Sequence, residues 1–344
     1  MNILHFIYGL NVGGAESFLK NLVSSMSDDN QFSFYYAIQN PNVSNSFFRQ
    51  FINTDKILRL PRFPNHPLAQ YRVLRKIIIQ SKIDLIHVHV NSLVNPIPLL
   101  LAKSLKVPVV VHSHNSSNAM GGALGRLLHK TNQAIFIRDE QIKVACSELA
   151  GRWMFGRFPF HSVPNSVDED RFQYNAKYRN EIRSRFKIGD ETNLIGIIGR
   201  LHTQKNHKRG VDIFKEFIRK YPNSKLIVIG DGPEREAIES YIKEQTMEDS
   251  IILAGNIDDV APYYSAIDIL LMPSHFEGLP VVGVEAQVSG LPILASDKVS
   301  EELKIASDVK FLSLSDENSC WVDSLMDLIT NSNEQTRTDA YIQS

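Results

Sequence analysis

The stretch PSHFEGLPVVGVE, residues 273–285, follows an apolar run at 266–272 that is typical of a buried strand. Behind Pro280 the apolar spacing becomes helical, and proline is well tolerated in the first turn of a helix. Glu277 is therefore predicted to lie in the loop before a helix, and Glu285 on the helix itself. Two carboxylates for hydroxyl groups, beside a helix N-terminus that can bind an anion, suit a sugar joined to a phosphate.

Length and composition indicate a two-domain protein with a large core. The chain has 344 residues, of which 43% are hydrophobic. A chain of this length is longer than a domain with one hydrophobic core usually is. Its two cysteines, Cys146 and Cys320, form no disulfide framework and favour a reducing compartment. We see no signal peptide at the N-terminus and no apolar run of spanning length. We therefore expect a cytoplasmic protein.

Charge divides the chain into a basic and an acidic half. Residues 1–160 hold 17 Lys and Arg against 8 Asp and Glu, whereas residues 161–344 hold 20 against 30. Such asymmetry suggests two domains with different partners. The basic half, with Arg72, Arg75 and Lys76 on one expected helix, could face an anionic membrane surface or a lipid-linked substrate. The alternative is a solvated basic face without a partner. We expect no nucleic-acid partner.

Strands that alternate with helices predict an α/β fold of two Rossmann-like, doubly wound domains that face each other across a cleft. The turn-rich segment 164–168 marks the end of the first domain, so we place the domains at 1–165 and 166–344. In such sheets, ligands bind beyond the carboxyl ends of the strands.

In the first domain, a glycine pair and two histidine pairs follow expected strands. Gly13 and Gly14 lie where a strand turns into a helix, and backbone can approach a phosphate there, although a plain turn is the alternative. His87 and His89, like His112 and His114, share one face of an extended chain. We expect two of the four to be packed core residues and His114 to point into the cleft. A metal site would need four converging ligands, and we expect none.

In the second domain, the cationic residues Arg200 and Lys205 follow a strand that ends at Gly199. An arginine clamp with a lysine point charge can hold a diphosphate. A departing diphosphate gains negative charge, so cations aimed at it stabilise the transition state more than the ground state. Two solvated surface residues are the alternative. Gly230-Asp231-Gly232-Pro233 follows the next expected strand.

These motifs, taken in order, make the chain similar to the glycosyltransferases of family 4, which are retaining enzymes of GT-B fold, and above all to bacterial capsular and exopolysaccharide transferases. The resemblance covers nearly the whole length and rests on the following segments: 13–16, 111–115, 165–168, 199–200, 205–206, 230–233 and the glutamates at 277 and 285.

The resemblance implies a hexosyltransferase that uses a nucleotide sugar, most commonly a UDP-sugar, and needs neither a metal nor another cofactor. The first domain would bind a saccharide or lipid-linked saccharide acceptor, and the second the donor. His114, Arg200, Lys205 and Glu277 would act at the reacting sugar and its diphosphate, and Glu285 on the ribose. The residues implied in nucleotide-sugar binding are Gly13, Gly14, Gly199, Arg200, Lys205, Gly230, Asp231, Gly278, Leu279 and Glu285. Front-face attack would explain retention.

Two departures and two alternatives accompany this interpretation. Ser166 stands where many relatives have glycine, and the C-terminus is short, so it is open whether 333–344 crosses back to the first domain. One alternative is a nucleotide-sugar epimerase of the same fold, which would need no acceptor. The other is a two-domain sugar-binding protein without chemistry.

Overall fold

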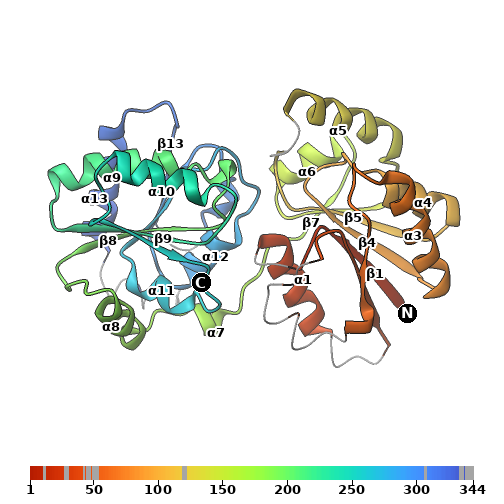
Figure 1. The fold of residues 1–344 in the computed structure, drawn as a ribbon, viewed down its shortest axis with the longest axis horizontal. Helices are drawn as coiled ribbons and strands as arrows, with labels where there is room; N and C mark the ends of the chain where they lie inside the picture. The colour runs from red at the N-terminus through yellow and green to blue at the C-terminus, as the bar shows by residue number, and fades with distance from the viewer. Residues whose placement is uncertain are drawn as a thin grey trace. The chain divides into compact units, whose positions relative to one another are not determined.

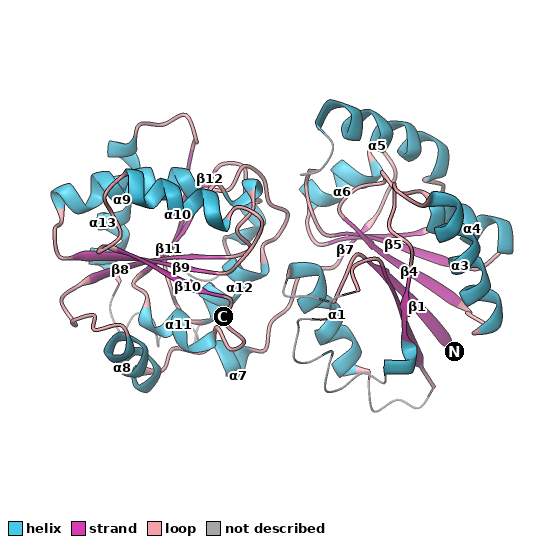
Figure 2. Ribbon diagram, in the orientation of Figure 1, coloured by secondary structure: helices cyan, strands magenta, loops and turns pink. Residues whose placement is uncertain are grey.

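The computed structural model describes residues 1–10, 13–26, 31–41, 43, 48, 54–117, 122–305, 308–332 and 337. The chain divides into two compact units, Met1–Asn165 and Ser166–Ser344. Each is built on one parallel sheet with helices on both faces (Figures 1 and 2).

The sheet of the N-terminal unit has the strand order β3-β2-β1-β4-β5-β6-β7. Its strands are β1 (Asn2–Ile7), β2 (Ser33–Ile38), β3 (Ile57–Arg59), β4 (Leu85–Val90), β5 (Val109–Ser113), β6 (Ile142–Ala145) and β7 (His161–Ser162). Its helical segments are α1 (Gly14–Ser25), η1 (Thr54–Lys56), α3 (Pro67–Gln80), α4 (Ile97–Leu105), α5 (Gly122–Phe136) and α6 (Glu148–Phe155). Because the order reverses between β1 and β4, the switch point lies at the carboxyl ends of these two strands.

The sheet of the C-terminal unit repeats the scheme in the order β10-β9-β8-β11-β12-β13. Its strands are β8 (Asn193–Ile198), β9 (Ser224–Ile229), β10 (Ile251–Gly255), β11 (Ile269–Met272), β12 (Ile293–Ser296) and β13 (Val309–Leu312). The order reverses between β8 and β11, and Glu277 follows β11.

Helices cover both faces of this second sheet. They are α7 (Glu169–Phe172), α8 (Ala176–Arg185), η2 (Thr203–Lys205), α9 (His207–Lys220), α10 (Arg235–Glu244), α11 (Ala261–Ala266), α12 (Val281–Val288), η3 (Glu301–Leu303) and α13 (Asn318–Asn331). The helices α9, α10 and α13 lie together on one face, whereas α8, α11 and α12 lie on the other (Figure 1). Phe214, Phe217 and Trp321 are fully buried in the core of the first of these faces.

The predicted α/β class with two Rossmann-like, doubly wound units is confirmed, with two corrections of detail. The apolar run 266–272 is not all strand, because α11 extends to Ala266 and β11 begins only at Ile269. Asp268 interrupts the run, and its carboxylate accepts hydrogen bonds from Arg179, Arg183 and the Leu194 amide. The sequence analysis also missed the edge strands β3, β7 and β13 and the helix α4.

The question whether 333–344 crosses back to the first domain concerns residues outside those described, except Arg337. Its buried guanidinium donates hydrogen bonds to the carbonyls of Tyr264, Ser265, Ile267 and Ser289, all within the C-terminal unit.

Candidate functional site

In the C-terminal unit, the loops after β8, β11 and β12 are joined to one another at the switch point of the sheet. The amide of His275 donates to the carbonyl of Gln204 at 2.8 Å, and the amide of Glu277 donates to the carbonyl of Lys298 at 3.1 Å. The Gln204 side chain donates to the Phe276 carbonyl at 3.1 Å and to Glu277 Oε2 at 3.0 Å. Three separate loops are thus held as one surface at the carboxyl edge of the sheet.

Lys205 and Glu277 form an ion pair on this surface. Lys205 Nζ lies 2.7 Å from Glu277 Oε1, and the two side chains are only 17% and 9% exposed. Because charges this far from water are costly to bury unpaired, each group fixes the other. The result is an ammonium group held at the end of β8, beside the start of α9. The structure brings Lys205 and Glu277 together, as expected from the sequence for residues of one site.

Arg200 and Asp231 lie in the exposed part of the same edge. Arg200 is exposed, and among the described residues no ion pair involves its guanidinium. Asp231 Oδ1 accepts the amide of Gly232 at 2.8 Å. The backbone of Asp231 also accepts the amide of Leu201 at 3.0 Å, so the loops after β8 and β9 are linked as well. Arg200 is therefore available to a ligand.

Two glycines allow these loops to approach each other. Gly230 has φ +140°, and a Cβ atom there would lie 2.0 Å from the Gly199 carbonyl oxygen. Gly199 has φ +148°, and a Cβ atom there would meet the aliphatic chain of Lys205 at 2.9 Å. Both conformations strain any side-chain-bearing residue. The packing of these loops therefore requires glycine at both positions, whether or not a phosphate binds there.

Glu285 lies one turn into α12 and is 9% exposed. Its Oε2 accepts a hydrogen bond of 2.6 Å from the hydroxyl of Tyr264, a fully buried residue of α11. Burial, reinforced by the neighbouring carboxylate, raises the pKa of Tyr264 well above its ordinary value. Tyr264 therefore remains a hydrogen-bond donor that orients Glu285. Gly278 and Leu279 are buried in the turn that leads into α12.

In the N-terminal unit, Gly13 and Gly14 form the start of α1, which follows β1. Gly13 is the N-cap residue in an extended conformation. Because α1 follows β1, its first backbone N–H groups lie at the carboxyl edge of the sheet, as in anion-binding helix termini.

His114 follows β5 and is half-buried. Its Nε2 lies 2.9 Å from His89 Nδ1, and Phe18 of α1 packs against its ring. Burial lowers the pKa of His114 to about 3, so the imidazole is neutral at pH 7. His89 and His112 are buried, as expected for two packed core histidines.

Three contributing residues were missed from the sequence. Gln204 precedes the predicted Lys205, and its amide, which bridges Phe276 and Glu277, carried no motif signal of its own. Tyr264 precedes the strand run and looks like an ordinary core aromatic residue. His5 lies in the first apolar strand. Its proximity to His87 becomes apparent only when the two strands pair in the sheet.

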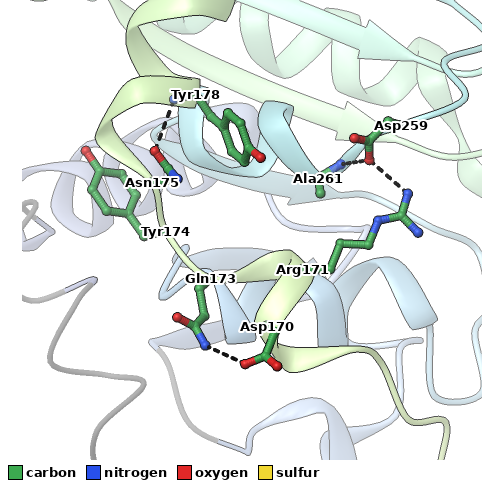
Figure 3. Close-up of a pocket in the computed structure, with 8 residues that line it drawn as sticks. All are labelled: Asp170, Arg171, Gln173, Tyr174, Asn175, Tyr178, Asp259 and Ala261. Carbon is green, nitrogen blue, oxygen red and sulfur yellow. Dashed lines mark hydrogen bonds and ion pairs between the residues drawn. The ribbon is translucent and has the colours of Figure 1, made fainter.

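A polar hollow of about 200 Å³ lies elsewhere in the C-terminal unit (Figure 3). It is lined by Asp170, Arg171, Gln173, Tyr174, Asn175, Tyr178, Asp259 and Ala261. Several polar groups that line it bond to one another or to the backbone: Arg171 pairs with Asp259 at 2.8 Å, and Asn175 caps α8. None of the predicted site residues lines this hollow.

Both halves of the chain match families of known proteins. The family described as Glycosyltransferase Family 4 matches residues 12–171, and that described as Glycosyl transferases group 1 matches residues 178–344. EpsF of Bacillus subtilis (strain 168), a provisionally named glycosyltransferase, is 30% identical over 335 residues, which cover 94% of this chain and 86% of EpsF.

Two further proteins extend the comparison. The UDP-Gal:alpha-D-GlcNAc-diphosphoundecaprenol alpha-1,3-galactosyltransferase of Escherichia coli is 25% identical over 246 residues, or 67% of this chain and 61% of that protein. HepE of Anabaena, solved in complex with UDP-glucose, superposes with a TM-score of 0.80 at 17% identity and covers 100% of this chain and 94% of its own. The likeness to HepE shows the fold.

Proposed function

The chain belongs to the glycosyltransferases that combine a family 4 domain with a group 1 domain, and we propose that it is a retaining hexosyltransferase of polysaccharide biosynthesis. It takes a hexose from a nucleotide diphosphate sugar and attaches it to a saccharide or lipid-linked saccharide. The C-terminal unit binds the donor and the N-terminal unit the acceptor. The observation that carries this proposal is the Lys205–Glu277 ion pair on the joined loops at the switch point.

The cations bind the diphosphate. Lys205 is already fixed by Glu277, and Arg200 is exposed on the same edge, so both charges are present before the sugar–phosphate bond breaks. Preorganised charge of this kind stabilises the departing diphosphate without reorganisation during the reaction. The exposed backbone of the loops at Gly199, Gly230 and Asp231 borders the same anion.

The carboxylates bind hydroxyl groups. Glu285, oriented by Tyr264, accepts the ribose hydroxyls of the nucleotide. Glu277, with the turn at Gly278 and Leu279, binds hydroxyls of the transferred sugar while it holds Lys205. His114 donates to the sugar from the N-terminal unit, and the Gly13–Gly14 helix start faces phosphate.

The reaction balances without a protein nucleophile. The bond between the anomeric carbon and the diphosphate oxygen breaks, and the acceptor oxygen bonds to the same face of the sugar. The acceptor hydroxyl's proton passes to the leaving diphosphate. Retention of configuration follows from this front-face attack.

We assign a UDP-sugar as the donor, because HepE was solved with UDP-glucose and the Escherichia coli relative carries UDP-Gal in its name. The latter name also contains a diphosphoundecaprenol acceptor, which supports a lipid-linked acceptor here. A lipid-linked acceptor requires contact with a membrane surface. No helix in the described parts of the chain is long and apolar enough to cross a membrane.

The helix α5 provides a surface suited to that contact. Its outward side carries Leu124, Leu127, Leu128 and Ile135, which are 66%, 62%, 40% and 48% exposed. Spacings of three, four and eleven residues place these side chains on one stripe of a helix. Exposed basic residues, Arg126 and Lys130, lie on the solvent-exposed part of the helix to one side of the stripe, and α5 contains no acidic residue. An apolar stripe with neighbouring basic residues is typical of helices that lie in an anionic membrane interface.

The exposed face of α3 adds basic residues that an anionic membrane surface would attract. Arg72, Arg75 and Lys76 are all exposed, as the charge asymmetry of the sequence suggested. Each basic residue near an anionic surface contributes about 1 kcal/mol of attraction at physiological salt.

The catalytic proposal is tested by a screen of nucleotide sugars followed by a product assay. A binding nucleotide sugar raises the melting temperature by mass action, and we expect a UDP-hexose to give the largest shift. Labelled hexose should then appear in a lipid-linked or soluble saccharide only when an acceptor is present. Conversion of the donor without an acceptor would identify an epimerase, and binding without any product would identify a sugar-binding protein.

The membrane proposal is tested by vesicle flotation at low salt. Wild-type protein should bind vesicles that contain phosphatidylglycerol and not pure phosphatidylcholine vesicles. The variant Leu124→Ser/Leu127→Ser/Leu128→Ser should lose this binding, whereas Ile305→Ser, an exposed apolar residue of the other unit, should retain it. Equal binding by both variants would reject α5 as the contact surface.

A further inference from the structure

Five histidines meet on one face of the N-terminal sheet. They lie on or directly after three adjacent strands: His5 on β1, His87 and His89 on β4, and His112 and His114 on β5 and just beyond it. The parallel register places His5 opposite His87 and His89 opposite His112. No metal site was expected from the sequence, because four ligands would have to converge; the fold adds His5 from a third strand and brings all five rings together.

The rings are joined through their nitrogen atoms. His5 Nδ1 lies 3.0 Å from His89 Nε2, and His89 Nδ1 lies 2.9 Å from His114 Nε2. His87 Nε2 lies 3.3 Å from His112 Nδ1.

Three buried nitrogens of this cluster have no hydrogen-bond partner: His5 Nε2, His112 Nε2 and His114 Nδ1. A buried polar atom without a partner costs about 1–3 kcal/mol. One of these atoms, His112 Nε2, is a ring nitrogen of the triad His89, His112 and His114 that is left to ligate an ion. In that triad each residue can offer a ring nitrogen within 4.8 Å of the others.

We propose that His89, His112 and His114 bind one divalent metal ion of the zinc class, with His5 and His87 as outer partners. The ligand atoms are His89 Nδ1, His112 Nε2 and His114 Nε2. His5 then accepts the remaining N–H of His89, and His87 accepts that of His112. This arrangement matches metal sites in which the second nitrogen of each ligating histidine is held by another group.

The distance between the His89 and His114 ligand atoms suits a tetrahedral ion. Zinc–nitrogen bonds of about 2.0–2.1 Å place neighbouring ligand atoms about 3.3 Å apart. The His89–His114 nitrogens at 2.9 Å need to separate by only a few tenths of an ångström. Phe18 stacks edge-on against His112 at 4.5 Å between ring centres and supplies an apolar wall. Three protein ligands leave the fourth position of a tetrahedral ion to water or another small ligand.

The proposed site differs from a packed cluster of core histidines because it binds a metal ion. Neutral imidazole is the form that ligates metals. Softer divalent ions that favour imidazole, rather than Mg²⁺ or Ca²⁺, are the expected occupants.

Cobalt(II) titration of the full chain tests the proposal. Untagged protein is stripped with EDTA, dialysed and titrated with Co²⁺ while the visible absorbance is recorded, and Zn²⁺ is then added in competition. We expect one Co²⁺ per chain with the intense absorption of a tetrahedral site, displaced by one Zn²⁺. Absence of this signal in the wild-type protein would overturn the proposal.

Variants separate the ligands from the surroundings. His112→Phe and His114→Gln should abolish the tetrahedral signal, and His5→Phe should weaken Zn²⁺ binding about 10–100-fold, as loss of an outer partner does. The matched control is His161→Phe, because His161 is exposed on β7. Far-UV circular dichroism identifies any variant that fails to fold, and the half-buried position of His114 makes its variant the safer one. Full binding by folded His112→Phe and His114→Gln would show that the ion binds elsewhere.

Discussion

In the N-terminal sheet, five histidines lie on or directly after β1, β4 and β5, whereas the matching strands of the C-terminal sheet, β8, β11 and β12, carry none. The two sheets nevertheless share the strand order 3-2-1-4-5-6 when the strands of each unit are numbered along the chain. The C-terminal unit instead uses ions. Lys205 pairs with Glu277 at one end of its sheet, and Arg179 and Arg183 pair with Asp268 at the other.

This difference shows how one topology can be given two kinds of polar interior. Neutral rings can be buried with only hydrogen bonds, whereas ions need opposite charges and further hydrogen bonds. Among the described residues, the unit with buried ion pairs is the one proposed to bind a diphosphate, so fixed charge lies where a charged ligand would need it. The comparison predicts that single substitutions cost more in the C-terminal unit.

The largest effect on stability is expected from Arg183→Met. Arg183 is 1% exposed, and its guanidinium donates to Asp268 and to the carbonyls of Ala266, Gly189 and Thr192. Methionine leaves a partly buried carboxylate and several carbonyls without this partner, so we expect a loss of about 3–5 kcal/mol in unfolding free energy. Urea denaturation measures it.

The control for Arg183 is Lys177→Met. Lys177 lies 3.9 Å from Glu181 with both side chains exposed, and such pairs contribute less than about 1 kcal/mol. Equal losses for the two variants would mean that burial does not decide the strength of ion pairs in this unit.

The fold was predictable because both sheets alternate apolar strands with helices of ordinary spacing. The edge strands β3 and β7, with three and two residues, are too short for a periodic signal. The residues of the candidate site that follow strands, Lys205 and Glu277, were found because carboxyl strand ends converge in any parallel sheet. Tyr264 and His5 were missed because their roles depend on partners about 20 and 80 residues away in the chain.

The next effect concerns transfer activity. Lys205→Met removes a charge proposed to stabilise the leaving diphosphate, and we expect kcat to fall at least a hundredfold, or about 3–4 kcal/mol. Glu277 also loses its ion pair, so the melting temperature is measured in parallel. Lys298→Met serves as control, since Lys298 is exposed and pairs only with the neighbouring Asp297 among the described residues. A Lys205→Met enzyme with normal kcat would remove Lys205 from the catalytic site.

A smaller effect should appear only in acid. His207, at the start of α9, is buried, and burial together with Lys205 lowers its pKa to about 4 from an ordinary 6.5. The unfolded chain therefore binds this proton at higher pH than the folded protein. Its contribution lowers stability progressively as pH falls from about 6.5 to about 4, by about 3 kcal/mol in all.

His207→Phe removes this penalty. Relative to wild type, the variant should gain about 3 kcal/mol of unfolding free energy between pH 7 and pH 4. The exposed His275→Phe, in the same unit, should show no comparable gain. A constant difference between His207→Phe and wild type across this pH range would show that His207 binds protons equally in both states.

The smallest effect is expected from the double variant His87→Phe/His112→Phe in the N-terminal unit, measured with EDTA present. His87 Nε2 and His112 Nδ1 bond to each other at 3.3 Å, and replacing both partners of a neutral hydrogen bond with apolar rings of similar shape is nearly neutral. We expect a change within about 1 kcal/mol, whereas His87→Phe alone leaves His112 without its partner and should cost about 1–3 kcal/mol. A double-mutant cycle in urea measures both. If the double variant lost as much stability as Arg183→Met, the imidazoles would be as strongly coupled to their surroundings as the buried ions, and the contrast between the two units would fail.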